Sequence, residues 1–391
     1  MKISAVENLH CNAGWRNLSF LKVTTDDGII GYSEYNQSPA YGSSGVATVI
    51  DALAPTVIGS NPLDHERLFS TLYGTTFPAS GGINAQAIAA IENALLDIKG
   101  KALGVPVYRL LGGAMRDRLR VYWSHCGTYR MHESTARFLG KPTLKSLDDV
   151  RALGEEVKKQ GFTALKCNMN VFDEQPHGYG WRRSFPDRNA EKVLIRAVYA
   201  QVEAFNEGTG GDVDILLDTV FTLTPESHIR MIRELTPLGL FWYELDIYNP
   251  DALAYIRQRT DTPIASCEKL YGIRDFRPYF QMQAMDVAII DVPRNGIWQS
   301  YKIATIAHAH DVNVAPHNFY GHLSNMMSAH FCAAVPNFRI MEIDIEDVPW
   351  MDDLVTHPPE IVDGHMLVPD RPGWGCDVDE KAMKAHPPQQ F

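Results

Sequence analysis

Hydrophobic residues follow two different periods along the chain, and the change falls near residue 118. Between Ser19 and Tyr35, two β-rich runs flank Asp27-Gly28, which has the turn chemistry of a hairpin. Apolar residues then recur every three or four positions in stretches that predict helices, at 43–57, 62–73 and 83–103. We therefore expect residues 1–118 to form an α+β unit.

Beyond residue 118, short β-branched or aromatic runs alternate with amphipathic helical stretches, which is the pattern of βα units around a parallel sheet. Polar residues end successive strands at intervals of 23 to 26 residues, the length that one strand, one helix and two loops require. The predicted strands are 119–126, 162–170, 213–219, 240–245, 263–267, 286–291, 313–318 and 338–344.

One interval is longer than the others, because a Gly-, Pro- and Arg-rich insertion occupies 171–189. Such an insertion is a candidate functional loop. The tail, 355–391, is rich in Pro and Gly with short apolar runs, and we expect it to pack back against the first unit. The predicted domains are thus 1–118, 119–354 and 355–391.

Three carboxylates end consecutive strands: Asp218, Glu244 and Glu268. In a (β/α) barrel the carboxyl ends of the strands meet at the active site, where three carboxylates would repel one another unless a hard cation lay among them. Oxygen ligands favour Mg²⁺, or Mn²⁺, over zinc. The alternative is that each carboxylate is a surface cap.

The next strands end in groups that suit acid–base chemistry. Asp291 can orient the imidazole of His317 as a general base, although a structural histidine is the alternative. Lys166 and Asn168 share the inward face of one strand, unless the lysine extends past the rim to solvent. Glu342 and Asp344 share a face of the last strand, and one of them is a candidate buried hydrogen-bond donor, with simple capping as the alternative.

Composition excludes several classes of protein. Hydrophobic residues make up 45% and charged residues 21%, as in folded globular proteins. A net charge of −11 and the lack of a basic cluster in the sequence argue against binding to the phosphates of nucleic acid. No apolar run is long enough for a signal peptide or a membrane span, so we expect a cytoplasmic protein, and six cysteines without a CxxC pair argue against a disulfide framework.

Taken together, these motifs resemble those of the mandelate racemase branch of the enolase superfamily. The similarity covers nearly the whole chain. It rests on AIENALLDIKGKALGVPVYRLLGG at 90–113, LKCN at 165–168, CEKLYGIRDFRP at 267–278, IIDVPRNG at 289–296, KIATIAHAHDVNVAPH at 302–317 and IMEIDIEDVPWMDDLV at 340–355.

The resemblance implies a (β/α)₇β TIM-like barrel with an α+β capping domain built from the N-terminal part and the C-terminal tail. It also implies one Mg²⁺ on the three carboxylates, a base pair of His317 and Asp291, and a homo-oligomer. Lys166 would contact the substrate carboxylate, and Glu342 would act as electrophile at its far oxygen.

The sequence departs from this family at the second base. Many members carry Lys-x-Lys where this chain has Lys166-Cys167-Asn168, which argues against two-base racemisation. Asn or His often follows the first metal ligand two residues on, and here that position is Val220, so a separate leaving-group acid is missing there. The resemblance also implies that the histidine face takes protons from R-configured α-carbons.

We therefore expect an acid-sugar dehydratase that forms a 2-keto-3-deoxy acid. The alternatives are an epimerase or cycloisomerase that uses the same ene-diolate and, from another class, a non-catalytic sugar-acid-binding relative. Specificity is expected from the loops at 11–17 and 74–82 and from the barrel insertion. The candidate substrate-binding residues are Asn168, Trp15, Arg16, His177, Arg182 and Arg183, with surface positions or subunit contacts as the alternative for the arginines.

Overall fold

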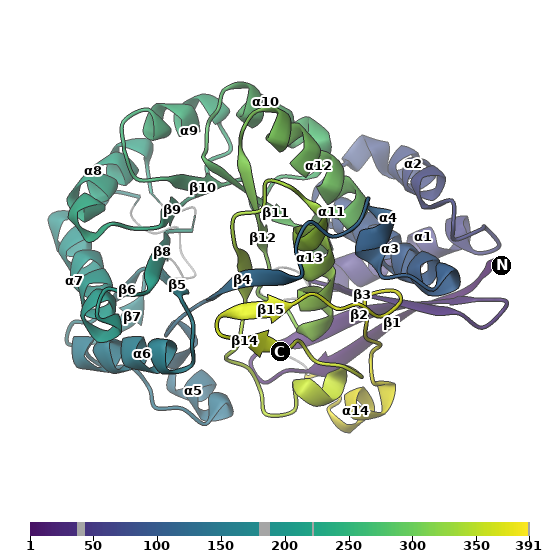
Figure 1. The fold of residues 1–391 in the computed structure, drawn as a ribbon, viewed down its shortest axis with the longest axis horizontal. Helices are drawn as coiled ribbons and strands as arrows, with labels where there is room; N and C mark the ends of the chain where they lie inside the picture. The colour runs from purple at the N-terminus through teal and green to yellow at the C-terminus, as the bar shows by residue number, and fades with distance from the viewer. Residues whose placement is uncertain (37–43, 180–187, 221–222, 390–391) are drawn as a thin grey trace.

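The computed structural model describes residues 1–36, 44–179, 188–220 and 223–389 (Figure 1). The chain begins with a small antiparallel sheet in the order β1 (Ile3–Asn12), β2 (Asn17–Thr25), β3 (Ile30–Tyr35). Helices α1 (Ser44–Val57), α2 (His65–Thr76) and α3 (Gly82–Leu103) follow, so the predicted hairpin and the three predicted helices are confirmed.

Helix α3 packs directly on β3 because glycine occupies position 31. A Cβ atom there would lie 2.2 Å from the carbonyl oxygen of Ala94, a distance that no real contact allows. The interface is apolar, with Leu21, Ile91 and Ile98 among its buried residues. This packing forms the core of the capping unit.

The predicted barrel strands are confirmed as parallel neighbours in one curled sheet. Their order is β12-β11-β10-β9-β8-β5-β4, with β13 on the other side of β4. A parallel bridge from Val314 to Phe338 joins the ends of the curl. The strands are β4 (Arg118–Trp123), β5 (Ala164–Asn168), β8 (Asp214–Asp218), β9 (Trp242–Glu244), β10 (Ile264–Ser266), β11 (Val287–Asp291), β12 (Asn313–His317) and β13 (Met341–Ile343).

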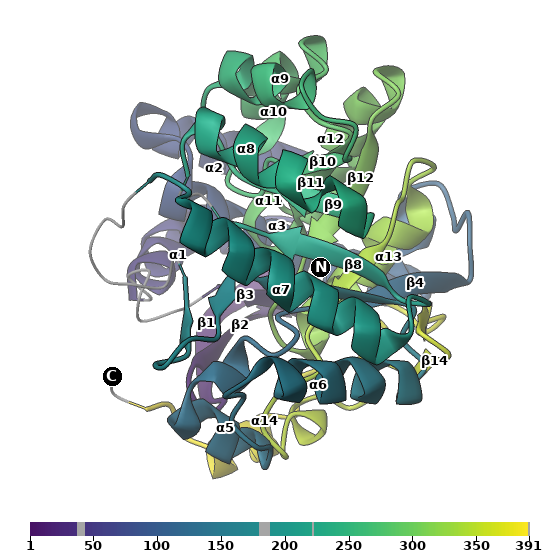
Figure 2. The same ribbon diagram turned by 90° about the vertical axis from the view of Figure 1, so that its left-hand side faces the viewer.

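Helices cover the outside of this sheet, and Figure 2 shows α6, α7 and α8 side by side across it. The main helices are α6 (Leu147–Lys159), α7 (Lys192–Thr209), α8 (Pro225–Leu235), α9 (Pro250–Arg257), α10 (Gly272–Gln281), α12 (Ile297–Ala309) and α13 (His322–Ala334). Shorter helical segments are Phe77–Ala79, α4 (Val107–Leu110), Tyr129–Met131, α5 (Glu133–Leu139), Thr236–Leu238, α11 (Val292–Asn295) and Asp352–Leu354.

The barrel insertion contains a short antiparallel ribbon of β6 (Asn170–Val171) and β7 (His177–Gly178). The predicted substrate-binding residues Arg182 and Arg183 lie outside the described residues.

The tail contacts both the barrel and the cap. Strand β15 (His365–Leu367) pairs antiparallel with β4 and with β14 (Ile361–Val362). The sequence analysis expected the tail to pack against the cap and did not predict this pairing with a barrel strand. Unlike the short barrel strands, β14 and β15 have no repeated βα spacing around them from which they could be predicted. Helix α14 (Glu380–Ala385) lies beside the cap sheet, where Glu380 forms an ion pair of 2.6 Å with Lys22. The division into three domains stays a prediction.

Two remaining features of the fold are the state of its cysteines and the hydropathy of its helices. All six cysteines are buried as free thiols. Within the described ranges, every helix is too short or too polar to cross a membrane.

Candidate active site

A cavity of about 370 Å³ lies between the cap and the carboxyl ends of the barrel strands. The cap supplies Trp15 and Arg16 from the β1–β2 loop, and the barrel supplies Lys166, Glu268 and His317 from strand ends. The structure therefore brings residues from distant parts of the sequence to one cavity, at the end of the barrel where active sites form.

His317 and Asp291 form a hydrogen-bonded pair. They are register partners on β12 and β11, and Nδ1 of His317 lies 2.6 Å from Oδ2 of Asp291. The same carboxylate accepts hydrogen bonds from the Tyr320 hydroxyl at 2.6 Å and the Arg294 backbone N–H at 2.7 Å. The contact with the Asp291 carboxylate assigns a proton to Nδ1, and Nε2 on the other side of the ring lies 3.4 Å from Glu268.

Opposing effects act on the pKa of His317. Burial lowers it, but the Glu268 and Asp291 carboxylates outweigh both burial and the Arg294 charge, so the pKa is raised. Arg294 links the dyad to Glu268, because its guanidinium lies 3.2 Å from Asp291 and 3.1 Å from Glu268. The sequence analysis missed Arg294 and Tyr320, although both lie within three residues of a dyad residue.

Asp218 ends β8 and Glu244 ends β9, whereas Glu268 lies just after the end of β10. Asp218 and Glu244 are register partners. Burial raises the pKa of Asp218 and of Glu244, and repulsion from neighbouring carboxylates adds to both shifts. For Glu268, burial also raises the pKa, but His317 and Arg294 outweigh it and bring the pKa to about 2.

Within the described residues, no three His, Cys, Asp or Glu side chains converge into a preformed metal cluster. Instead, Glu244 pairs with Lys166 at 3.3 Å, and Asp218 accepts a hydrogen bond from the Asn168 amide at 3.2 Å. The donor set nevertheless fits a hard divalent cation, because it consists of carboxylate oxygens that lie near one another and repel one another.

Lys166 and Glu342 form a buried ion pair of 2.8 Å. Glu342 also accepts hydrogen bonds from the Ser124 hydroxyl at 2.5 Å and the Asn318 backbone N–H at 2.6 Å. Burial alone would raise the pKa of Glu342, but Lys166 and His317 hold it far below its usual value. Glu342 is thus an acceptor here, and its predicted role as an electrophile stays a prediction.

Asn168 has both ends of its amide engaged. Its oxygen accepts from the Thr128 hydroxyl at 2.8 Å, and its nitrogen donates to Asp218. Asn168 lines the cavity, but in this arrangement its amide nitrogen is bound to the Asp218 carboxylate.

Trp15 and Arg16 close the cap side of the cavity. Arg16 donates to the Phe319 carbonyl and to the Asp347 carboxylate, and Trp15 packs on Tyr129 with ring centroids 4.9 Å apart. His177 lies on β7, where its Nδ1 is 2.9 Å from the Gln175 carbonyl oxygen.

The predicted cap loop at 74–82 lines a neighbouring cavity of about 410 Å³. Tyr271 and Arg294 line both this cavity and the central one, and Gln86 donates a hydrogen bond of 3.0 Å to the Tyr271 hydroxyl. The loop is therefore near the site but separated from it by these side chains.

A histidine that the sequence analysis did not identify also lines the central cavity. His125 follows β4, and burial lowers its pKa to about 3, with Lys166 and His317 adding to that shift. Its backbone φ of 48° lies in the left-handed region, which is uncommon outside glycine and often marks functional sites.

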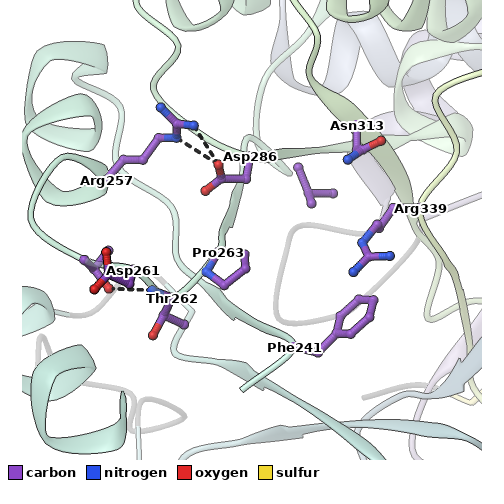
Figure 3. Close-up of a pocket in the computed structure, with 10 residues that line it drawn as sticks. Phe241, Arg257, Asp261, Thr262, Pro263, Asp286, Asn313 and Arg339 are labelled. Carbon is purple, nitrogen blue, oxygen red and sulfur yellow. Dashed lines mark hydrogen bonds and ion pairs between the residues drawn. The ribbon is translucent and has the colours of Figure 1, made fainter. Parts of the chain in front are cut away.

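A separate cavity of about 440 Å³ lies at the amino-terminal ends of β9 to β12 (Figure 3). Phe241, Asp286 and Arg339 line it, and Arg257 donates two hydrogen bonds to Asp286. Active sites of (β/α) barrels lie at the opposite, carboxyl-terminal ends of the strands, where the His317–Asp291 pair and the three carboxylates are found.

Two family profiles match the chain. Residues 12–112 match the mandelate racemase / muconate lactonizing enzyme N-terminal domain, and residues 149–382 match the enolase C-terminal domain-like family. A D-xylonate dehydratase from Haloferax volcanii is 32% identical over 94% of this chain and 84% of its own length. A D-mannonate dehydratase from Sphingomonas is 30% identical over 93% of this chain and 90% of its own length.

Solved structures give a second comparison. A Burkholderia xenovorans protein bound to magnesium and fumarate, provisionally named an L-alanine-DL-glutamate epimerase, is 48% identical with a TM-score of 0.96, covering 100% of this chain and 97% of that one. The resemblance drawn from the motifs is confirmed. The chain is an enolase-superfamily enzyme and belongs to the mandelate racemase / muconate lactonizing enzyme family.

Proposed function

We propose that the protein is a magnesium-dependent dehydratase that removes the α-proton of a hydroxy (sugar) acid and eliminates its β-hydroxyl to give a 2-keto-3-deoxy acid. The observation that carries this proposal is the hydrogen-bonded His317–Asp291 pair, whose Nε2 lies 3.4 Å from Glu268 at a cavity that Asp218, Glu268 and Lys166 also line. In this proposal His317 is the base, and the positive charge of Lys166 binds the substrate carboxylate.

The ligands we assign to Mg²⁺ are Asp218, Glu244 and Glu268. Magnesium is bound in the related Burkholderia xenovorans structure, which supports this cofactor. When bound, the ion would stabilise negative charge that develops on the substrate carboxylate.

In the proposed reaction, Nε2 of His317 takes the α-proton, and the electron pair of the C–H bond moves toward the carboxylate. Asp291 keeps the imidazole oriented and stabilises its positive charge. Lys166 stabilises the carboxylate end. The C–O bond to the β-hydroxyl then breaks, His317 returns its proton to the departing oxygen, and water leaves. The enol that remains tautomerises to the keto acid.

A second candidate function is epimerisation through the same ene-diolate. The name of the Burkholderia xenovorans relative favours it, whereas the names of the two dehydratase relatives favour elimination. Asn168 argues against epimerisation, because an amide cannot accept a proton near neutral pH from the second face of the α-carbon.

The test incubates the magnesium-loaded protein with a panel of mono- and dicarboxylic sugar acids, including D-xylonate and D-mannonate, in deuterated water. Dehydration predicts a keto acid, detected as its semicarbazone, in step with loss of the substrate. Deuterium at the α-carbon with a new epimer and no keto acid would support the epimerase instead. Binding of an acid without exchange or product would support the non-catalytic relative.

A further inference from the structure

His125 is a histidine of the cavity for which the proposed reaction has no task. Its ring stacks on Tyr129, with centroids 5.1 Å apart and planes 17° from parallel, and it contacts Phe319 at 5.6 Å. Only 8% of the residue is exposed. The left-handed backbone at position 125 and the aromatic contacts together hold the imidazole in one orientation.

Neighbouring hydrogen bonds determine which ring nitrogen carries the proton. The Ser124 hydroxyl donates its hydrogen to the ionised Glu342 carboxylate at 2.5 Å. Its oxygen, 3.0 Å from Nδ1 of His125, can therefore only accept from that nitrogen. Oδ2 of Asp344, a further acceptor, lies 3.9 Å from Nδ1. The proton thus resides on Nδ1, and Nε2 keeps its lone pair.

Nε2 has no hydrogen-bonding partner among the described residues, and the ring that carries it lines the cavity. A lone pair that opens into the cavity can accept a hydrogen bond from a donor on a bound molecule, and an ionised carboxylate is not such a donor. One serine hydroxyl separates the ring from Glu342, which forms the 2.8 Å ion pair with Lys166, the residue that we assign to the substrate carboxylate.

We propose that Nε2 of His125 accepts a hydrogen bond from a substrate hydroxyl within two carbons of the carboxylate, and so selects hydroxy acids over their deoxy analogues. This inference rests on the proposed function, because it uses the same cavity. It adds a specificity-determining contact that takes no part in proton abstraction.

The test measures the dissociation constants of malate and succinate for the magnesium-loaded protein by calorimetry. Malate carries its hydroxyl α to one carboxylate and β to the other, so either orientation presents it near His125. Wild type should bind malate about tenfold more tightly than succinate. His125→Phe keeps the aromatic stack but removes the acceptor, and should bind both acids with the affinity that wild type has for succinate.

Two further variants separate this contact from a general loss of structure. His125→Asn, whose side chain tolerates the left-handed backbone, should also lose the preference. Ser124→Ala removes the acceptor for Nδ1 and should reduce the preference, because the proton is then free to move to Nε2. Selective ¹⁵N labelling should show an unprotonated Nε2 in wild type whose resonance shifts with malate and not with succinate.

The inference is overturned if wild type binds malate no more tightly than succinate, if His125→Phe retains the preference, or if Nε2 is protonated. Failure of the proposed function has a different signature. In that case no acid exchanges its α-proton in deuterated water, while the binding preference and its dependence on His125 are still measurable.

Discussion

At the scale of single residues, hydrogen bonds fix the orientation of the side chains proposed for proton transfer. Asp291 accepts hydrogen bonds from His317, Tyr320 and the Arg294 backbone, and these contacts fix the orientation of the carboxylate and of the imidazole that it holds. The base and its orienting carboxylate are therefore separable by mutation.

His317→Asn should lower the rate of α-proton exchange by about 10² to 10⁴, since it removes the group that accepts the proton. Asp291→Asn should lower the rate by about 10² while leaving substrate affinity within about twofold, because it disturbs orientation and not contact. Exchange rates by proton NMR and dissociation constants by calorimetry check both. A His317 variant that exchanges at the wild-type rate would remove it as the base.

The proposed metal ligands give a second prediction at this scale. Glu244→Gln removes one of three anionic donors and should weaken Mg²⁺ binding by about tenfold or more. Excess chelator should abolish exchange in wild type, and added Mg²⁺ or Mn²⁺ should restore it. Glu155→Gln, on an exposed face of α6, is the matched control and should leave the affinity for Mg²⁺ unchanged.

His330 gives a prediction for stability against pH. It is fully buried between Tyr108 and Trp374, and burial lowers its pKa to about 4. Below pH 6.5 the unfolded chain binds a proton at this residue that the folded chain does not accept until about pH 4. Stability is therefore lost as pH falls through that window, by about 1.4 kcal/mol per pH unit.

Urea unfolding of His330→Gln should consequently show about 2 kcal/mol less loss of stability than wild type between pH 7 and pH 5. His357→Gln, at an exposed position, should follow the wild-type pH dependence. Parallel curves for wild type and the His330 variant would show that this histidine is not the group that titrates.

At the scale of elements, cap carboxylates bind the first turns of the helices that follow the dyad strands. Glu34 of β3 accepts from the backbone N–H groups of Gly321 and Ser324, at 2.6 and 2.9 Å, at the start of α13. Glu92 of α3 accepts from the Trp298 N–H at 3.2 Å, at the start of α12. Helix N-termini leave such donors unsatisfied, so these contacts join the cap to the strands of His317 and Asp291.

Glu34→Ala should destabilise the protein by about 2 kcal/mol or more, because two buried N–H groups would lose their acceptor. Chemical unfolding measures this, with Glu155→Ala as the exposed control. If α13 positions the end of β12, where His317 lies, the exchange rate should fall as well. A stability equal to that of the control variant would show that water replaces the carboxylate.

Elements with a strong period could be predicted from the sequence, and those fixed by distant contacts could not. The barrel strands were predicted because the spacing of Asp218, Glu244 and Glu268 repeats the length of a βα unit. Strands β14 and β15 were missed because the edge of β4 defines them, and His125 was missed because a left-handed backbone leaves no mark on composition. The helix-capping roles of Glu34 and Glu92 likewise depend on partners more than 200 residues away.

At the scale of the whole molecule, the proposed mechanism assigns the two faces of a bound α-carbon to different strands. His317 ends β12 and Lys166 lies in β5, and the strands between them in the curled sheet separate the two side chains across the barrel. On the face served by β5, the second position that could hold a base is Asn168, whose amide oxygen and nitrogen are both engaged. This asymmetry favours chemistry on one face.

Incubation of each α-epimer of an accepted acid in deuterated water tests this asymmetry. The 2R acid should lose its α-proton and its β-hydroxyl, and the 2S epimer should be inert or act as an inhibitor. Neither epimer should be converted into the other, because that requires a proton delivered from the β5 side. Asn168→Lys, which restores the Lys-x-Lys pattern, should introduce exchange from the 2S acid if position 168 addresses the second face. Interconversion by the wild-type protein would instead mean that Lys166 acts as a second base, and the epimerase would replace the dehydratase.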